Sequence, residues 1–212
     1  MRNLFKYGGI IASIVLIVGG VVSIGAGALG VMEVRNALSA EKIVGTDDMT
    51  PTAIRAAATE AGLNVATLDI PSQSVAGKTI DTGSEAKAFA GYMRIHALEA
   101  TDGQVYAEMG RYLDANGKAT NDEALAAKDP TTGQPVQNGL RNLWVTETAL
   151  TTALTTSFFA ERVAIFTLAI GGALLLTGIG FLVLTLGGAL RTAPAVKPAA
   201  SQPKPRVEPA SA

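Results

Sequence analysis

Two long stretches without a charged side chain constrain this chain more than any other feature. Residues 8–32 and 163–190 contain no Asp, Glu, Lys or Arg. A helix rises about 1.5 Å per residue and a bilayer core is about 30 Å thick, so roughly 20 apolar residues suffice to cross it. Soluble core helices rarely stay uncharged for so long, because one of their faces meets water. We therefore expect transmembrane helices over 8–32 and 163–190.

The first stretch also has the general layout of a secretory signal. Arg2 and Lys6 precede it, and the small residues 25–28 offer a place for cleavage. Signal cores are usually about 7–15 residues long, and this stretch is well beyond that length. We therefore favour a retained helix over a cleaved one.

The charges beside the two spans predict their orientation, because Lys and Arg near a span favour the cytoplasmic side. Two basic residues lie in 1–7, and 191–212 carries four basic residues and one acidic residue. Subtracting these from chain totals of 17 basic and 18 acidic residues leaves 11 and 17 in residues 33–162, a net charge of −6. We expect a multi-pass protein of the cell (cytoplasmic) membrane, with both termini cytoplasmic and an extracytoplasmic domain over 33–162.

Composition limits the partners of this domain. The chain has no cysteine, so disulfides cannot stabilise it in an oxidising envelope. The acidic balance of 33–162 argues against nucleic acid, because phosphate binding needs a basic face. The Pro- and Ala-rich residues 191–212 cannot bury a core, so we expect a disordered cytoplasmic tail.

We expect a mainly helical domain with a small extended excursion. The first span should continue to about Val44, and Thr50 with Pro51 should start a helix that Gly62 ends. Residues 64–82 mix apolar residues with Gly, Ser and Thr, which indicates an extended segment or a small hairpin. Ser84 should begin a helix that runs to about Ala100.

The second half of the domain shows further helical spacing. One helix is expected after Asp102, a turn at Asn116-Gly117, and a short helix from the capping-box spacing of Thr120 and Glu123. A final helix should begin near Asn138, and from Leu140 it runs without Gly or Pro into the second span. Four apolar residues support the helix after Asp102: Val105, Met109, Tyr112 and Leu113.

Little in the sequence indicates catalysis or a cofactor. His96 is the only histidine, and metal sites need several converging ligands, so we expect no metal. A pair of His96 and Glu99 on one helix face is more often structural than an acid–base dyad. The loop that begins at Asp114 departs from a calcium loop, because Lys118 is at its fifth position and Leu125 at its twelfth. No nucleotide-binding or nucleophile motif occurs.

The spans themselves lack the ionisable residues that transporters and channels use. They do contain small residues at four-residue spacing, which lets helices approach closely. The pairs are Gly8/Ala12, Ser23/Gly27, Ala26/Gly30 and Ala169/Ala173.

Charged residues at the outer membrane edge predict contacts between the two spans. If the spans are antiparallel neighbours, Glu33 can meet Arg162 and Arg35 can meet Glu161. Such partly exposed pairs contribute about 0–1 kcal/mol each.

Trp144 and Arg141 are the candidate partner contacts. They lie three residues apart on the last helix of the domain, and both residue types are enriched at interface hot spots. Trp144 also fits an apolar stripe with Leu140, Leu143 and Leu150, so a place in the core is the alternative.

Three stretches carry a resemblance to a known group: residues 92–101 (YMRIHALEAT), 106–114 (YAEMGRYLD) and 141–150 (RNLWVTETAL). They are similar to uncharacterised actinobacterial membrane proteins with the same two-span layout, over nearly all the chain except the tail. The resemblance implies no catalytic residues. Such sequences are sometimes labelled aromatic-ring-opening dioxygenases, but those enzymes need an iron site with several His and carboxylate ligands, and this chain has one histidine.

These observations favour a non-catalytic accessory or scaffold protein, anchored in the lipid bilayer, whose outer domain binds an envelope or membrane protein or a second copy of itself. The alternative is an envelope hydrolase that uses carboxylates only, with Glu99, Asp102 and Glu108 as the nearest cluster. Glycosidases use such pairs, but their clefts are lined with aromatic residues, and this domain has one Trp and few Tyr.

Overall fold

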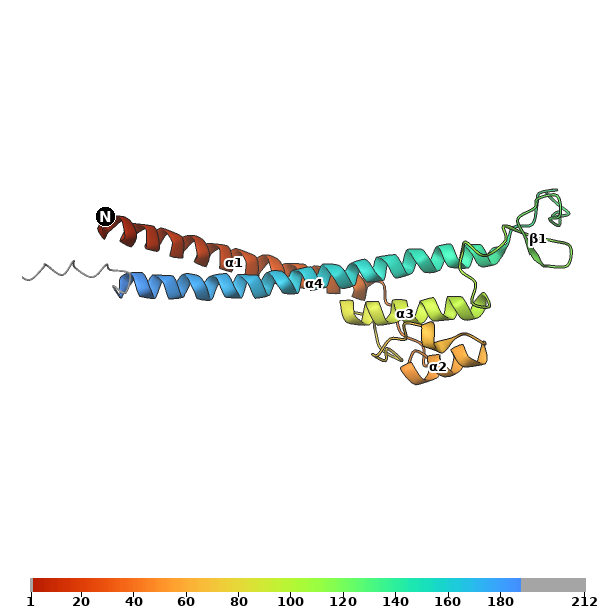
Figure 1. Ribbon diagram of the computed structural model, residues 1–212, viewed down its shortest axis with the longest axis horizontal. Coiled ribbons are helices and arrows are strands. Elements are labelled where there is room, and N and C mark those ends of the chain that lie inside the picture. The colour runs from red at the N-terminus through yellow and green to blue at the C-terminus, as the bar shows by residue number, and fades with distance from the viewer. Residues whose placement is uncertain (1, 188–212) are drawn as a thin grey trace, which may run out of the picture.

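The computed structural model describes residues 2–187, with side chains placed from residue 7. Within this range the protein is mainly helical and elongated (Figure 1). Two long helices, α1 (Arg2–Ala40) and α4 (Gly139–Leu186), lie side by side and antiparallel. Both are long and apolar enough to cross a membrane. The expected tail, 191–212, and the last residues of the second span lie outside the described range.

A seam of small residues brings α1 and α4 together. On α4 the buried residues recur every seven positions, at Ala164, Gly171, Gly178 and Thr185. A seven-residue repeat is the spacing that keeps one helix face against a partner. A Cβ added at Gly20 of α1 would lie 2.6 Å from the backbone nitrogen of Leu175. The helices therefore approach at backbone distance.

This seam corrects the small-residue pairs expected from sequence. Gly27 lies in the seam, and Ser23 and Gly30 are half-buried beside it. The other members of those pairs lie on exposed faces: Gly8, Ala12, Ala26, Ala169 and Ala173. Four-residue spacing occurs on every face of helices this rich in Gly and Ala, so it did not identify the packed face.

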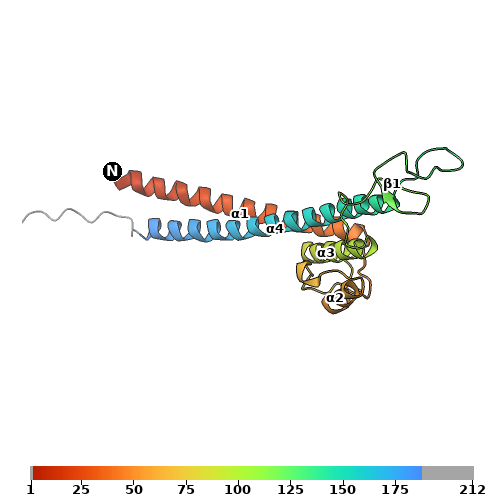
Figure 2. The same cartoon turned by 45° about the vertical axis from the view of Figure 1, so that its right-hand side comes forward.

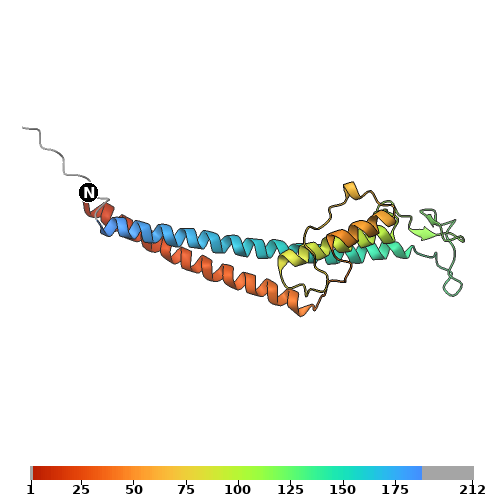
Figure 3. The ribbon, with the colours of Figure 1, turned by 90° about the horizontal axis from the view of Figure 1, so that it is seen from below.

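Residues 41–100 pack on one side of α4, next to the C-terminal end of α1, whose Leu38 is buried in the same core (Figure 2). Helix α3 (Gly83–Ala100) lies along α4, and the short helix α2 (Pro51–Glu60) covers α3 (Figure 3). The core between them includes Ile54, Tyr92 and Ile95 from α2 and α3, with Leu154 from α4. The apolar faces of the helices thus bury one another.

Helix α3 begins two residues earlier than Ser84 would place it. Its N-cap is Thr82, whose hydroxyl accepts from the Glu85 amide, while the Glu85 carboxylate accepts from the Thr82 amide. This reciprocal capping box needs an acid three residues after the cap. Thr82 has Glu85 there, whereas Ser84 has Lys87.

Residues 64–82 form turns and extended segments, as expected, apart from a single 3-10 turn, η1 (Val65–Thr67). Helix α1 ends at Ala40 rather than Val44, and Val44 pairs with Thr79. The excursion therefore pairs with the strand-like residues after α1, not with itself. The N-cap at Thr50 and a left-handed Gly62 (φ +74°) confirm the predicted limits of α2.

The prediction of two helices between residues 102 and 138 is wrong. This segment forms turns and a two-residue hairpin, β1 (Tyr112–Leu113) with β2 (Ala119–Thr120), closed at Asn116-Gly117 as predicted. The Thr120 hydroxyl accepts from the Asp122 amide in a turn instead of capping a helix. Gly110 allows the β2 backbone to approach, because a Cβ there would lie 2.5 Å from the Thr120 nitrogen.

Candidate functional site

The Glu161 carboxylate joins α1, α3 and α4. One of its oxygens accepts from Arg35 Nε at 2.8 Å, and the other accepts from the Gly83 amide at 2.9 Å. The Glu161 side chain is 4% exposed, and that of Arg35 is 51% exposed. The structure thus brings together one of the two pairs expected at the membrane edge. The charge on Glu161, through this hydrogen bond, raises the pKa of Arg35.

The other expected pair, Glu33 with Arg162, is not within ion-pair distance in residues 2–187. Instead the Arg162 guanidinium lies 5.1 Å from the centre of the Phe158 ring. Arg162 is exposed and follows Glu161 on α4, so it points away from the α1 seam.

Trp144 lies in the core and not on a contact surface. It is 2% exposed and packs against Ala97 and Met109. Its indole N–H donates to the Thr101 hydroxyl at 3.3 Å. Trp144 therefore occupies the core position that the sequence offered as the alternative to a partner contact.

Arg141 holds the distal loops onto the start of α4. Its guanidinium donates to the backbone oxygens of Tyr106 and Met109, at 3.1 and 2.6 Å, and lies 3.8 Å from the Tyr106 ring centre. Asn138 adds a hydrogen bond to the Gly110 carbonyl. The Arg141 side chain is engaged within the chain, which makes it a support for the loops.

A second buried carboxylate, Glu147, was not recognised in the sequence. Its Oε2 accepts from Arg94 of α3 at 3.0 Å, and the Arg94 guanidinium lies 4.0 Å from the Trp144 ring centre. The signal was present: Glu147, Leu154 and Glu161 are seven residues apart and all are buried. A continued seven-residue repeat indicates a buried face, even at a charged residue.

His96 lies between two carboxylates. Its Nδ1 is 2.9 Å from Glu99, as the pairing on one helix face suggested, and its Nε2 is 3.3 Å from Asp48. A hydrogen bond from the Thr46 hydroxyl lowers the pKa of Asp48; partial burial opposes this, and positive charge on His96 adds to it. Each ring nitrogen of His96 therefore faces a carboxylate.

An apolar groove runs beside His96 between α3 and α4. It has a volume of about 340 Å³. Seven residues line it: Met93, His96, Ala97, Leu143, Thr146, Glu147 and Leu150. Leu143 and Leu150 remain 37% and 40% exposed. The groove therefore offers apolar surface in a domain whose helices are otherwise covered on their inner faces.

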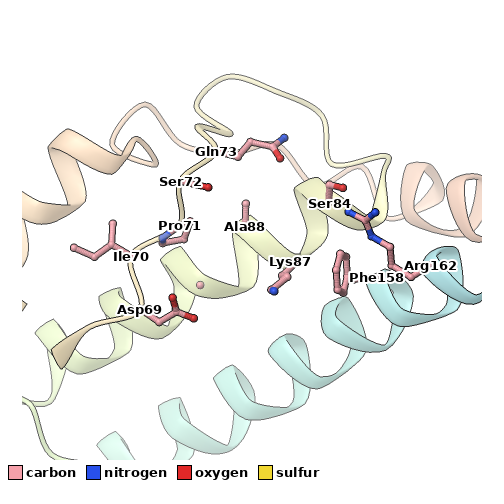
Figure 4. Close-up of a pocket in the computed structure, with 11 residues that line it drawn as sticks. Asp69, Ile70, Pro71, Ser72, Gln73, Ser84, Lys87, Ala88, Phe158 and Arg162 are labelled. Carbon is pink, nitrogen blue, oxygen red and sulfur yellow. The ribbon is translucent and has the colours of Figure 1, made fainter. Parts of the chain in front are cut away.

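A second, more polar pocket lies between α3, residues 69–73 and α4 (Figure 4). Its volume is about 510 Å³, and Lys87 and Arg162 are the basic residues on its wall. Sequence reasoning missed this pocket, because three distant segments form it and none carries a motif.

The other candidate ligands serve local structure. Asp114 accepts from the amides of Asn116 and Lys118, which explains its place in the turn. Glu108 accepts from the Val105 amide, and Asp102 takes a left-handed conformation (φ 50°) at the end of α3. Within residues 2–187 no group of three His, Cys, Asp or Glu side chains is placed to hold a metal ion.

Comparison with known proteins gave no match: neither a protein-family model, nor a curated protein, nor a solved structure is significantly similar to this chain.

Proposed function

We propose that this chain is a non-catalytic accessory or scaffold protein of the cell membrane. In this proposal α1 and α4 span the bilayer with both termini cytoplasmic, and residues 33–162 form the outer domain. That domain binds an envelope or membrane protein, or a second copy of itself. The observation that carries the proposal is the apolar groove between α3 and α4, held on a helix of 48 residues that continues into the span.

The composition of the groove supports binding of an apolar segment. Leu143 and Leu150 are seven residues apart on α4, so they lie on one face, and Met93 faces them from α3. Methionine adapts its shape to different apolar partners. The apolar lining of the groove is the surface that an apolar segment of the partner would contact.

The state of the polar groups favours binding over catalysis. Both nitrogens of His96 face carboxylates, and Glu147 faces Arg94. Of the carboxylates that a hydrolase would need, Glu99 bonds His96 and Glu108 bonds the Val105 amide. Groups engaged in this way are positioned to stabilise the fold, and a general acid or base needs a free face toward its substrate.

Substitutions in the groove test the proposal. Leu143→Asp with Leu150→Asp should leave folding intact, because both side chains are exposed, and should abolish co-purification of the partner in mild detergent. Val145→Asp is the matched control, since Val145 is exposed on the same helix but does not line the groove.

A different pattern would reject the scaffold function. If the groove variants co-purify the same proteins as the wild type, while Glu99→Gln and Asp102→Asn alone produce a cellular phenotype, the hydrolase alternative replaces it. Circular dichroism on each variant separates loss of binding from loss of folding.

A further inference from the structure

We propose that the pocket between α3, residues 69–73 and α4 binds the phosphate of an anionic phospholipid headgroup. This inference rests on the proposed membrane placement of α1 and α4. Three segments contribute the lining residues labelled in Figure 4: residues 69–73, helix α3 with Ser84 and Lys87, and helix α4 with Phe158 and Arg162.

The level of the pocket along α4, at the edge of the uncharged run, favours a lipid as its ligand. Arg162 is the last charged residue before the uncharged residues 163–190. Phe158 lies one helical turn above it on α4. In a bilayer this boundary is the level of the headgroups, where long basic side chains place their charge beside phosphate. In the proposed membrane placement the pocket lies at this level.

Two cations line the pocket beside one aromatic ring. Lys87 Nζ and the Arg162 guanidinium lie 4.9 and 5.1 Å from the centre of the Phe158 ring, which stands between them in Figure 4. Within residues 2–187 neither cation has a carboxylate within 4.0 Å. The nearby acids are engaged elsewhere: Glu161 with Arg35 and Gly83, and Glu85 in the capping box. Both cations are therefore available to a ligand.

The remaining polar groups limit the charge of that ligand. The side chains of Ser72, Ser84 and Gln73 add hydrogen-bond donors to the wall. Asp69 adds one negative charge, so the lining carries a net charge of +1 with Lys87 and Arg162. A phosphodiester headgroup carries one negative charge and matches this balance.

Lipid retention measures the site directly. The full chain is reconstituted in nanodiscs of equal phosphatidylglycerol and phosphatidylcholine, released, and examined by native mass spectrometry. Wild type should retain phosphatidylglycerol selectively. Lys87→Gln with Arg162→Gln should lower that retention about twenty-five-fold, since each basic residue near an anionic surface contributes roughly five-fold. Lys78→Gln with Arg55→Gln, exposed cations away from the pocket, is the matched control.

Two further variants test whether the charge of the pocket determines phosphatidylglycerol retention. Asp69→Asn should raise phosphatidylglycerol retention, because it removes the opposing charge. Lys87→Arg with Arg162→Lys should restore retention lost in the glutamine variants, because both charges return. Decreased retention in Asp69→Asn would overturn the assignment of an anionic headgroup.

Three results would overturn the proposal: equal retention of both lipids by wild type, equal loss in the control and pocket variants, or displacement of the lipid by excess inorganic phosphate. The last result would assign the site to a free anion. Partner co-purification is measured on the same samples. The scaffold function fails if groove variants keep the partner, whereas the lipid site fails through the lipid-retention results, so the two failures are distinguishable.

Discussion

Glu161 does more than set the register of two helices. Its two carboxylate oxygens serve different elements, the Arg35 guanidinium on α1 and the Gly83 amide at the start of α3. It therefore ties the beginning of α3 to the point where α1 and α4 meet. A hydrogen bond to a buried, charged acceptor is worth about 1.5–3 kcal/mol, which exceeds the worth of an exposed ion pair.

This difference predicts an asymmetry between the two partners. Glu161→Ala should lower the free energy of unfolding by about 2–3 kcal/mol, because the Gly83 amide loses its acceptor. Arg35→Ala should cost less than Glu161→Ala, because it removes only one of the two hydrogen bonds of Glu161 and leaves the Gly83 bond in place. Urea unfolding in detergent measures both. A loss from Arg35→Ala as large as that from Glu161→Ala would contradict the role assigned to the Gly83 bond.

The lowered pKa of Asp48 predicts an acid-sensitive contribution to stability. Unfolded Asp titrates near pH 3.9, and a folded pKa below that value stabilises the fold above this pH and is lost as pH falls through the folded pKa. Thr46→Val removes the main cause, so unfolding free energy should fall less steeply on acidification below about pH 4. Thr59→Val, which removes only a bond to the Arg55 carbonyl, is the control. Identical acid profiles for Thr46→Val and wild type would contradict this.

At the scale of elements, two adjacent glycines of α1 distinguish the effect of helix packing from the effect of helix propensity. A Cβ at Gly20 would lie 2.8 Å from the Gly171 carbonyl oxygen, whereas one at Gly19 meets nothing within 4 Å. Gly20→Ala should therefore destabilise the α1–α4 pair by about 1–3 kcal/mol through overpacking. Gly19→Ala should be neutral or stabilising, because alanine favours helix. Unfolding in mixed detergent measures both, and equal effects would contradict the seam.

The start of α3 offers a similar comparison. Thr82→Ala should cost about 1 kcal/mol, because the Glu85 amide loses the hydroxyl that caps the helix. Ser84→Ala should change the unfolding free energy by only a few tenths of a kcal/mol, because Ser84 lies inside the helix. Thermal unfolding followed by circular dichroism measures both. A larger loss from Ser84→Ala would return the cap to the position expected from sequence.

The helices that the sequence predicted well are those with strong local signals. The uncharged runs locate α1 and α4, and Thr50-Pro51 locates α2. The segment from 102 to 138 could not be predicted this way, because distant groups determine it. Arg141 and Asn138 bind the carbonyls of Tyr106, Met109 and Gly110, so these carbonyls are not available to a helix.

The candidate site was only partly predictable for the same reason. The Arg35–Glu161 contact follows from sequence, because two antiparallel spans must bring their outer ends together. The pocket around Lys87 and the position of Asp48 beside His96 depend on how residues 41–82 fold over α3. Trp144 satisfied both a surface and a core pattern, and only its neighbours Ala97 and Met109 distinguish the two.

At the scale of the whole molecule, the main prediction is the orientation of α1 and α4 across the membrane. Asn116→Cys and Ser201→Cys each place one thiol in this cysteine-free chain. Because basic residues flank both termini, only the cysteine at 116 should react with a membrane-impermeant thiol reagent in intact cells. Both should react after the cells are lysed. Labelling at 201 alone in intact cells would reverse the topology.

Helix α4 has no break between the domain and the apolar run. Residues 139–162 precede the uncharged run as part of the same helix, so in the proposed membrane placement the distal loops lie about 36 Å above the hydrocarbon. Spans tilt to match bilayer thickness. With no break in α4 from Gly139 to Leu186, a change of about 10° in tilt displaces the distal end by roughly 6 Å, by the geometry of a rigid helix. Membrane thickness would then govern how far the groove and distal loops reach toward a neighbour.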